Sequence, residues 1–224
     1  MEKIRSIQTE YNGYLFRSRL EARWAVFFDA CGADWEYEPE GIVLSDGTKY
    51  LPDFYLIDFH CYFEVKRKGI QGTDQGSEAE SKISDGMHCD RWAGIIAYGD
   101  PMDDALIIFC QETDDGGGGS YENGVTIGIH PDTGKPHLFA YTDRRDRYFM
   151  TSFAEDGSAE IPMTTHEYGR YCYKDFVTDK VVAARKLARQ ARFEHGETPE
   201  IRRVRHAWTE HCIREQPQRK AVVE

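Results

Sequence analysis

The chain has 224 residues, of which 40% are hydrophobic and 30% charged, and its formal net charge is -11 at pH 7. This length suits one main α/β domain with an appendage better than two independent domains. The longest apolar runs, near Ile95 and Ile107, are too short to span a bilayer, and the N-terminus lacks the apolar region of a signal peptide. We therefore expect a cytoplasmic protein with no membrane partner.

The first predicted helix runs from Ser18 to Cys31, because apolar residues recur at helical spacing and Gly32 is placed to end it. Extended segments follow, with a tight turn at Asp46-Gly47 between two of them. These segments are Trp35 to Glu38, Ile42 to Leu44, Lys49 to Ile57, and Cys61 to Lys66. The pattern is typical of a meander of strands.

A second helix is predicted after this meander. The polar, glycine-rich segment from Gly69 to Gly76 leads into a helix at about Ser77 to Ser84, and short buried strands follow at Trp92 to Tyr98 and Ala105 to Gln111. The predicted order is therefore helix, three strands, helix, and one or two strands.

The rest of the chain is predicted to extend this core. Asp114 to Ser120 is a flexible loop by composition, natural or an engineered linker, and carries no motif. A hairpin is expected at Val125 to Ile129 and His137 to Tyr141, a helix from about Lys174 to Arg192, and a loose end past Gln216. We divide the chain into a core at 1–112, a loop and hairpin extension of the same domain at 113–145, and a C-terminal helical, partly basic extension at 146–224.

Six cysteines are scattered along the chain with no CxxC pair. This spacing fits reduced, mostly buried thiols better than a disulfide framework or a zinc ribbon. His206, His211 and Cys212 are not predicted to bind a metal, because a spacing of five residues does not put both imidazoles on one helical face. The cysteines are Cys31, Cys61, Cys89, Cys110, Cys172 and Cys212.

The chemistry is predicted to lie on two neighbouring strands. Side chains alternate along Cys61 to Lys66, so Glu64 and Lys66 share a face. On the preceding strand Asp53 lies between apolar neighbours. A carboxylate is unusual in such a position, which indicates a specific role for Asp53. If the strands pair through a turn near Asp58 to His60, Asp53 lies beside Glu64, and the ammonium group of Lys66 lies next to both carboxylates.

Two converging carboxylates with a lysine outline a site for Mg²⁺ or Mn²⁺. Phosphodiester hydrolysis requires charge neutralisation at the non-bridging oxygens and a deprotonated water in line with the leaving oxygen. Asp53 and Glu64 would hold the ion through oxygen ligands, with the Val65 carbonyl as a further ligand. Lys66 would orient or deprotonate the water, or stabilise the developing negative charge.

These residues carry a resemblance to a known family. Pro52-Asp53 followed by Glu64-Val65-Lys66 resembles the signature of the PD-(D/E)XK nuclease superfamily, and the helix bearing Glu21 resembles its first core helix. The match covers roughly Tyr11 to Tyr98. Three segments are similar, more narrowly, to small endonuclease-like proteins of phages and actinobacteria: Phe16 to Ala25, Tyr37 to Gly41, and Tyr50 to Phe54.

The resemblance implies a restriction-endonuclease-like α/β fold, with an αβββαβ core, a mixed central sheet flanked by helices, and here a C-terminal helical extension. It implies Asp53 and Glu64 as metal ligands, Lys66 as the catalytic lysine, and Glu21 as an additional acid near the metal or its water. The implied activity is that of a Mg²⁺-dependent endonuclease, with DNA preferred over RNA. A homodimer also fits, since many such nucleases cut both strands as dimers, and the host cytoplasm is expected if the protein is phage-encoded.

Each site residue also has a structural interpretation. Asp53 could be a turn or strand-end residue satisfied by backbone amides, and Glu64 with Lys66 an exposed pair on one face. Taken separately these interpretations are favoured, but jointly, with this order and spacing, they rank below the site. Ser18 and Glu21 have the spacing of a capping box, which we weigh equally with the catalytic role of Glu21. Arg17, Arg19 and Arg23 are candidate phosphate contacts, although arginines around a helix are more often solvated or paired with acids. Tyr62 is a candidate for base stacking or a phosphate contact, although a surface tyrosine on a sheet is commoner.

Other functions remain open at this point. The net charge favours a non-catalytic module on the same fold that binds a protein or nucleic acid, because phosphate binding depends on Lys and Arg. The net negative charge counts against nucleic-acid binding, but it is unevenly distributed. The segment from Lys180 to His206 has eight basic residues and three acidic ones, and such a local patch can attract a polyanion. For the helix in this segment, packing on the domain with a solvated basic face ranks ahead of DNA binding. Hydrolysis of RNA or a nucleotide by the same site would differ only in substrate.

Overall fold

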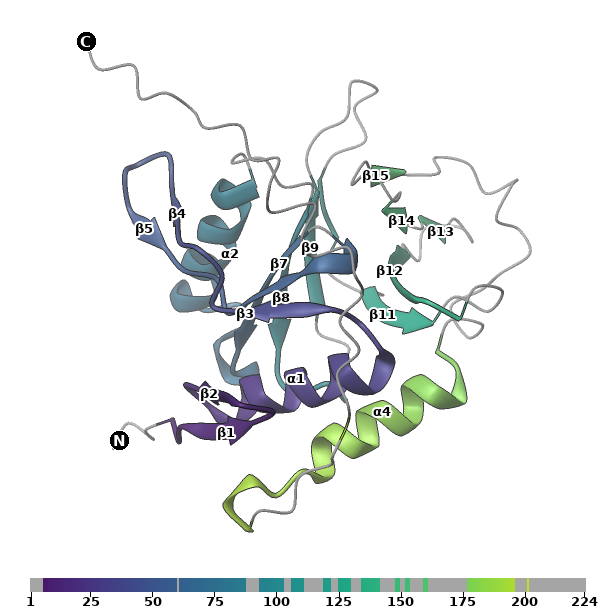
Figure 1. Cartoon of the computed structure of the whole chain (residues 1–224). Coiled ribbons are helices and arrows are strands. Elements are labelled where there is room, and N and C mark those ends of the chain that lie inside the picture. The colour runs from purple at the N-terminus through teal and green to yellow at the C-terminus, as the bar shows by residue number, and fades with distance from the viewer. Residues whose placement is uncertain are drawn as a thin grey trace.

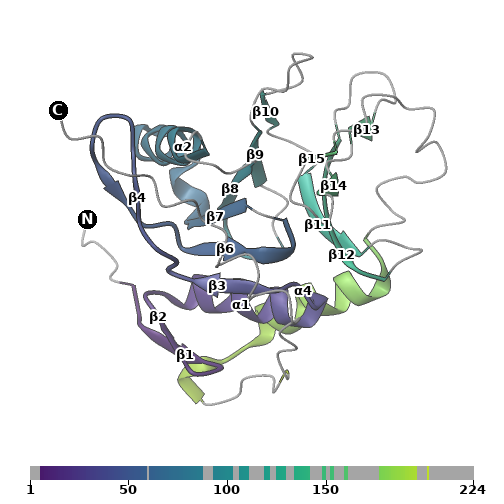
Figure 2. The same cartoon turned by 45° about the horizontal axis from the view of Figure 1, so that its top comes forward.

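A six-stranded sheet lies at the centre of the computed structural model, which describes residues 6–59, 61–87, 93–102, 106–110, 119–121, 125–129, 134–141, 148–149, 152–153, 159–160, 177–195 and 201. The strand order is β10-β9-β8-β7-β6-β3; Figure 1 labels β9, β8, β7 and β3, and Figure 2 labels all six strands. The strands are β3 (Trp35–Tyr37), β6 (Phe54–Leu56), β7 (Cys61–Lys66), β8 (Ala93–Tyr98), β9 (Leu106–Cys110) and β10 (Gly119–Tyr121).

The sheet is mixed, because β7 and β8 are parallel and the other neighbours are antiparallel. Parallel neighbours need a crossover connection, and helix α2 (Asp74–Met87) lies in that connection. Helix α1 (Arg19–Cys31) precedes the sheet strands. For the strands of the central sheet, the predicted order of helix, three strands, helix and strands is confirmed. The mixed α/β class with helices flanking the sheet is confirmed as well.

Helices cover both faces of the sheet (Figure 2). On one face, α1 and α4 (Asp179–Gln190) pack into a core cluster that includes Phe28, Phe54 and Phe63. On the other, α2 packs into a second cluster through Ile83, together with Tyr62 of β7. The side chains of β7 therefore alternate between the two layers as predicted.

Helix α1 has clear signals at both ends. The Ser18 hydroxyl accepts a hydrogen bond from the Glu21 amide at 3.2 Å, which caps the N-terminus. Gly32 ends the helix in the left-handed conformation, with φ of 81°. The indole of Trp24 donates to the Gly99 carbonyl at 2.9 Å, which ties α1 to the loop after β8.

Two hairpins flank the start of α1 and the sheet. The first, β1 (Thr9–Tyr11) and β2 (Tyr14–Phe16), was not predicted. The second consists of β4 (Ile42–Val43) and β5 (Lys49–Tyr50), which form a separate two-stranded sheet with the predicted turn at Asp46-Gly47. The single strand predicted from Lys49 to Ile57 is wrong: it breaks between β5 and β6 around Pro52, a residue that cannot donate to a strand ladder.

Helix α2 is longer than predicted, since it begins at Asp74 rather than Ser77 and ends at Met87. The glycine-rich composition of Gly69 to Gly76 suggested a loop there. Gly76 lies inside the helix, and a Cβ on it would lie 2.5 Å from the Ile70 carbonyl oxygen. The glycine therefore permits close packing of the helix start against the short 3-10 helix Lys68–Ile70.

Gly76→Ala is expected to destabilise the protein by about 1–3 kcal/mol, because the added methyl group cannot be accommodated without a backbone shift. This reverses the usual stabilisation of a helix interior by a glycine-to-alanine change. The control is Gly69→Ala, where the added Cβ meets nothing within 4 Å. Urea unfolding measures both, and equal stability of the two variants would contradict the packing role of Gly76.

The remaining described elements lie C-terminal to the sheet. Gly119 and Ser120 belong to β10, so the predicted loop is wrong at its end, and residues 114–118 lie outside the described residues. The predicted hairpin is confirmed as β11 and β12. Short strands precede α4 in the segment predicted to be helical. The elements are β11 (Val125–Ile129), β12 (Pro136–Tyr141), β13 (Tyr148–Phe149), β14 (Ser152–Phe153), β15 (Ala159–Glu160), and the 3-10 helices Ile57–Phe59 and Phe193–His195.

Helix α4 packs on α1 through Val181, Ala184 and Ala188, which all belong to the core cluster of α1. Cys31 and Cys61 are buried and form no disulfide with a described residue, in line with the prediction of reduced, buried thiols. No helix in the described ranges is both long and apolar enough to cross a membrane. The side chains of the other cysteines, the trio His206, His211 and Cys212, and the segment past Gln216 lie outside the described residues.

Candidate active site

Asp53 and Glu64 meet at the end of the β6–β7 ladder. The register pairs Phe54 with Phe63, so the next residues outward, Asp53 and Glu64, lie opposite each other. The Asp53 amide donates to Glu64 Oε2 at 3.2 Å, and the two residues are only 3% and 4% exposed. The predicted pairing through a turn near Asp58 therefore brings the two carboxylates together.

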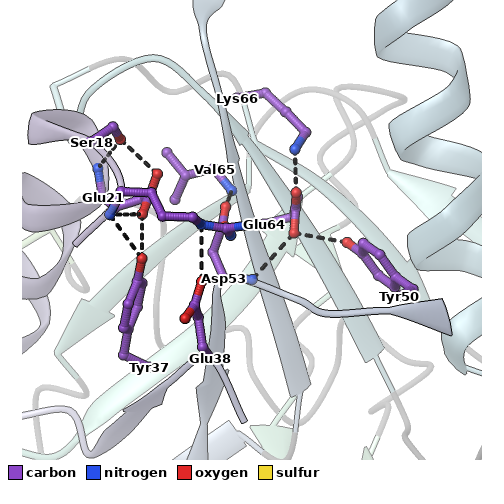
Figure 3. Close-up of polar contacts among 10 residues, drawn as sticks. Ser18, Glu21, Tyr37, Glu38, Tyr50, Asp53, Glu64, Val65 and Lys66 are labelled. Atoms are coloured by element: carbon purple, nitrogen blue, oxygen red, sulfur yellow. Dashed lines mark hydrogen bonds and ion pairs between the residues drawn. The ribbon is translucent and has the colours of Figure 1, made fainter. Parts of the chain in front are cut away.

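Each carboxylate has one oxygen held by a backbone amide and the other by a cationic side chain. Asp53 Oδ2 accepts from the Val65 amide at 2.7 Å, and Oδ1 contacts the Arg17 guanidinium. Glu64 Oε2 accepts from the Asp53 amide and Oε1 contacts the Lys66 ammonium (Figure 3). The amides fix the orientation of both carboxylates before any ligand binds.

The surroundings of Asp53 disfavour its negative charge. Burial, with the nearby charges of Glu64 and Glu21, raises the pKa of Asp53 to about 7, although Lys66 and the Val65 amide act in the opposite direction. Burial of like charges is costly unless cations compensate them. The cluster therefore favours binding of a further positive charge.

Both carboxylate oxygens of Glu21 accept hydrogen bonds. Oε1 accepts from the Ser18 hydroxyl at 2.7 Å, while Oε2 accepts from the Tyr37 hydroxyl at 2.7 Å and the Arg17 amide at 3.1 Å. Glu21 thus contributes to the helix start, in a variant of the predicted capping box. Its charge also acts on Asp53 and Arg17. The structural and electrostatic roles of Glu21 coexist.

Tyr50 is a site residue that sequence reasoning missed. Its hydroxyl donates to Glu64 Oε2 at 2.8 Å from the end of β5 (Figure 3). Burial and the Glu64 charge raise the pKa of Tyr50 above its ordinary value, so the hydroxyl stays protonated and remains a donor. The Tyr50-Leu51-Pro52-Asp53 segment was singled out only through the family resemblance, and no spacing pattern pointed to Tyr50 itself.

Tyr50→Phe is expected to weaken divalent-metal binding about tenfold, because Glu64 loses a donor that fixes its orientation. The matched control is Tyr11→Phe, which removes a 2.9 Å hydrogen bond from a tyrosine hydroxyl to the buried Asp29. That variant should lose stability and keep its metal affinity. Calorimetric titration with Mn²⁺ measures both variants, and unchanged affinity in Tyr50→Phe would contradict the positioning role.

Four residues were predicted to contact nucleic acid, and the structure places one of them at the site and another in the core. Arg17 lies at the site, where its Nε also pairs with Glu38 Oε1 at 3.0 Å. Tyr62 is 4% exposed and packs in the cluster under α2, so its burial makes it unsuited to stacking on a base. It is a core residue and not the surface tyrosine of the alternative interpretation. For Arg19 and Arg23 a phosphate contact stays a prediction.

The donor set suits a hard cation such as Mg²⁺. The Lys66 carbonyl accepts from the Gly99 amide on the β8 side, so the Val65 carbonyl, one residue earlier, points toward the opposite edge and Asp53. Among the described residues, no group of three or more His, Cys, Asp or Glu side chains is arranged to hold a metal. The available ligands are two carboxylates and a carbonyl, which would leave positions for water.

Comparison with known proteins adds no family assignment. No protein-family model matches the chain, and no curated protein matches it. The function of the chain is therefore inferred from the geometry of the site and from its sequence motif.

Proposed function

We propose that the protein is a Mg²⁺-dependent nuclease that hydrolyses phosphodiester bonds at the site formed by Asp53, Glu64 and Lys66, with Glu21 as the additional acid. The observation that carries this proposal is the buried pair of carboxylates formed by Asp53, directly before β6, and Glu64 of β7, with the Lys66 ammonium on Glu64. Mn²⁺ is expected to substitute for Mg²⁺.

The energetics of the carboxylate pair support a binding role. The two carboxylates are almost fully buried, so they lose hydration, and the charge of Glu64 disfavours the charge of Asp53. If these two positions served only to hold the fold together, uncharged polar side chains would form the same hydrogen bonds without this cost. A divalent cation bound between them would offset both the repulsion and the lost hydration.

The chain's own residues have separable tasks in this chemistry. The bound metal would supply charge neutralisation for the phosphodiester and lower the pKa of a water molecule. Asp53, Glu64 and the Val65 carbonyl would hold it, and the Val65 amide fixes the Asp53 carboxylate. The Lys66 side chain is 29% exposed, so it can reach an attacking water or a phosphate oxygen beside Glu64. Tyr50 and the Asp53 amide keep Glu64 in place.

The arrangement of the core supports the restriction-endonuclease-like fold as part of the same proposal. Helix α1, strands β3, β6 and β7, helix α2 and strand β8 follow one another in the αβββαβ order. The resemblance of Pro52-Asp53 and Glu64-Val65-Lys66 to the nuclease signature falls on the β6–β7 end where the carboxylates meet. DNA is the preferred substrate on that resemblance, and RNA or a nucleotide would use the same site.

The proposal is tested by cleavage of supercoiled plasmid, linear duplex, single-stranded DNA and RNA with Mg²⁺, Mn²⁺ or EDTA. We expect cleavage of DNA with either metal and none with EDTA. Cleavage of RNA alone would keep the site and change the substrate. Cleavage unaffected by EDTA would contradict the metal-dependent mechanism.

A second candidate is a non-catalytic binding module on the same fold, and the net charge of -11 favours it. Its acidic surface would suit a basic protein partner. Thermal unfolding with Mn²⁺ separates the two candidates, because a ligand that binds only the folded state raises the melting temperature. Stabilisation by Mn²⁺ that is lost in Glu64→Gln supports the nuclease, and no stabilisation supports the module.

Metal affinity is expected to rise with pH and to level off above about pH 7. The raised pKa of Asp53, about 7, means that its carboxyl holds a proton at lower pH, and that proton competes with the metal. Calorimetry with Mn²⁺ in buffers of different ionisation heat should show release of about one proton at acidic pH and little above neutrality. An affinity that does not change across this range would contradict the competition.

A further inference from the structure

Both carboxylates of the site hold a cationic side chain on the oxygen that the backbone leaves available. Arg17 occupies Asp53 Oδ1 and Lys66 occupies Glu64 Oε1. The other oxygens are engaged by the amides of Val65 and Asp53. A metal ion that binds both carboxylates directly must therefore share or displace at least one of these cationic contacts.

Arg17 is better placed than Lys66 to move away. Lys66 is on the same strand as Glu64, two residues along, and its side chain is 29% exposed. Arg17 precedes α1, and its side chain is 50% exposed, whereas that of Asp53 is 4% exposed. The guanidinium thus lies over a buried carboxylate from the solvent side, where an incoming substrate would arrive.

Glu38 provides a second anchor for Arg17. Its carboxylate pairs with Arg17 Nε at 3.0 Å, and its amide donates to the Asp53 carbonyl at 2.9 Å. Glu38 has a positive φ of 46°, which is unfavourable for a residue with a long side chain. Such backbone strain is typical of functional sites. An arginine that leaves Asp53 would remain tethered at the site by Glu38.

We propose that Arg17 is an exchangeable stand-in for the metal: it neutralises Asp53 in the metal-free protein and, when a divalent cation takes Asp53, it turns to bind the phosphodiester of the substrate. This inference rests on the proposed function. The planar guanidinium suits the second role, because it binds two phosphate oxygens at once and keeps its charge. Binding of the metal to Asp53 would then release Arg17 to bind the phosphate.

The exchange predicts opposite changes in two affinities. Arg17→Gln removes the competitor and should tighten Mn²⁺ binding about fivefold, the effect of an ordinary half-exposed ion pair. The same variant, made in the slowly cleaving Lys66→Ala background, should bind a short fluorescent DNA duplex less tightly in the presence of Mn²⁺. The control is Lys82→Gln, which removes a positive charge from an exposed pair with Glu78 on α2 and should leave Mn²⁺ affinity within about twofold.

A spectroscopic measurement follows Arg17 itself. In ¹⁵N-labelled protein, the Arg17 Nη2 resonance, assigned by its loss in Arg17→Gln, should shift on addition of Mg²⁺, because Nη2 is the atom that contacts Asp53. The metal-free Asp53→Asn variant should show a shift in the same direction, because the charge that holds the guanidinium is gone. A resonance that saturating Mg²⁺ leaves in place would overturn the exchange.

The outcomes separate failure of this inference from failure of the proposed function. If the wild type binds Mn²⁺ through Asp53 but Arg17→Gln binds it equally or more weakly, Arg17 supports the metal site and the exchange is wrong. If Arg17→Gln tightens Mn²⁺ binding without weakening DNA binding, the arginine only blocks the metal and the phosphate role is wrong. If the wild type does not bind Mn²⁺, both proposals fail.

Discussion

Asp53→Asn is expected to abolish metal-dependent cleavage, with a loss of at least about a thousandfold in rate. The change keeps the shape of the side chain and removes the charge that would hold the cation. The Asp53 amide is unaffected and can still donate to Glu64. Initial rates on the preferred nucleic acid and calorimetry with Mn²⁺ measure the two losses, and circular dichroism verifies the fold.

The matched control for this variant is Asp29→Asn. Asp29 is also a buried carboxylate, 8% exposed, but it accepts from Tyr11, Asn12 and Trp35 and serves the core. This change should lower stability and leave the rate per folded molecule nearly intact. Full activity in a folded Asp53→Asn protein would exclude the proposed metal site.

Trp35→Ala is expected to lower the free energy of unfolding by about 3–5 kcal/mol. Trp35 is fully buried on β3, and its ring lies against Tyr14, Phe16 and Phe54. Its indole also donates to Asp29 Oδ1 at 2.8 Å, so the change leaves a cavity and removes a donor from a buried carboxylate. The loss is a large share of the stability of an ordinary domain.

Leu15→Ala is the control for Trp35→Ala, because Leu15 is 60% exposed on the neighbouring hairpin. Its effect should stay within about 0.5 kcal/mol. Urea unfolding of both variants, followed by fluorescence and circular dichroism, gives the comparison. Similar stability of the two proteins would show that the aromatic cluster around β3 does not dominate the core.

Local patterns were enough to predict the elements that carry the site. Helix α1 has a serine cap, a buried aromatic stripe and a terminal glycine, so its sequence signals agree with its structure. Strand β7 alternates between two buried layers, which follows from the two-residue period of a strand. Asp53 and Glu64 could be paired because a short turn leaves few registers for adjacent strands.

Other features were missed for two different reasons. The β1–β2 hairpin had a readable signal, since Asn12-Gly13 favours the positive φ angles of 49° and 82° that its turn adopts. The start of α2 had none, because Gly76 is required by contact with Ile70 and not by a turn. Composition cannot distinguish a glycine that permits close packing from one that ends a helix.

The partners of the acids also depended on tertiary structure. Tyr50 reaches Glu64 from a hairpin outside the central sheet, and Tyr37 reaches Glu21 from β3. Arg17 contacts Asp53 across 36 residues of sequence. No periodicity connects these positions. Sequence reasoning therefore named the acids, Lys66 and, as a nucleic-acid contact, Arg17. It missed Tyr37 and Tyr50, whose hydroxyls orient Glu21 and Glu64.

The most direct test of the central claim compares wild type with Lys66→Ala in single-turnover cleavage of a labelled DNA duplex, with Mg²⁺ added or chelated. We predict that the wild type cuts only with the metal. Lys66→Ala should still bind Mn²⁺ by calorimetry, because Asp53 and Glu64 remain, but should cut at least about a hundredfold more slowly. Equal rates in the two proteins, or cutting that persists after chelation, would contradict the account.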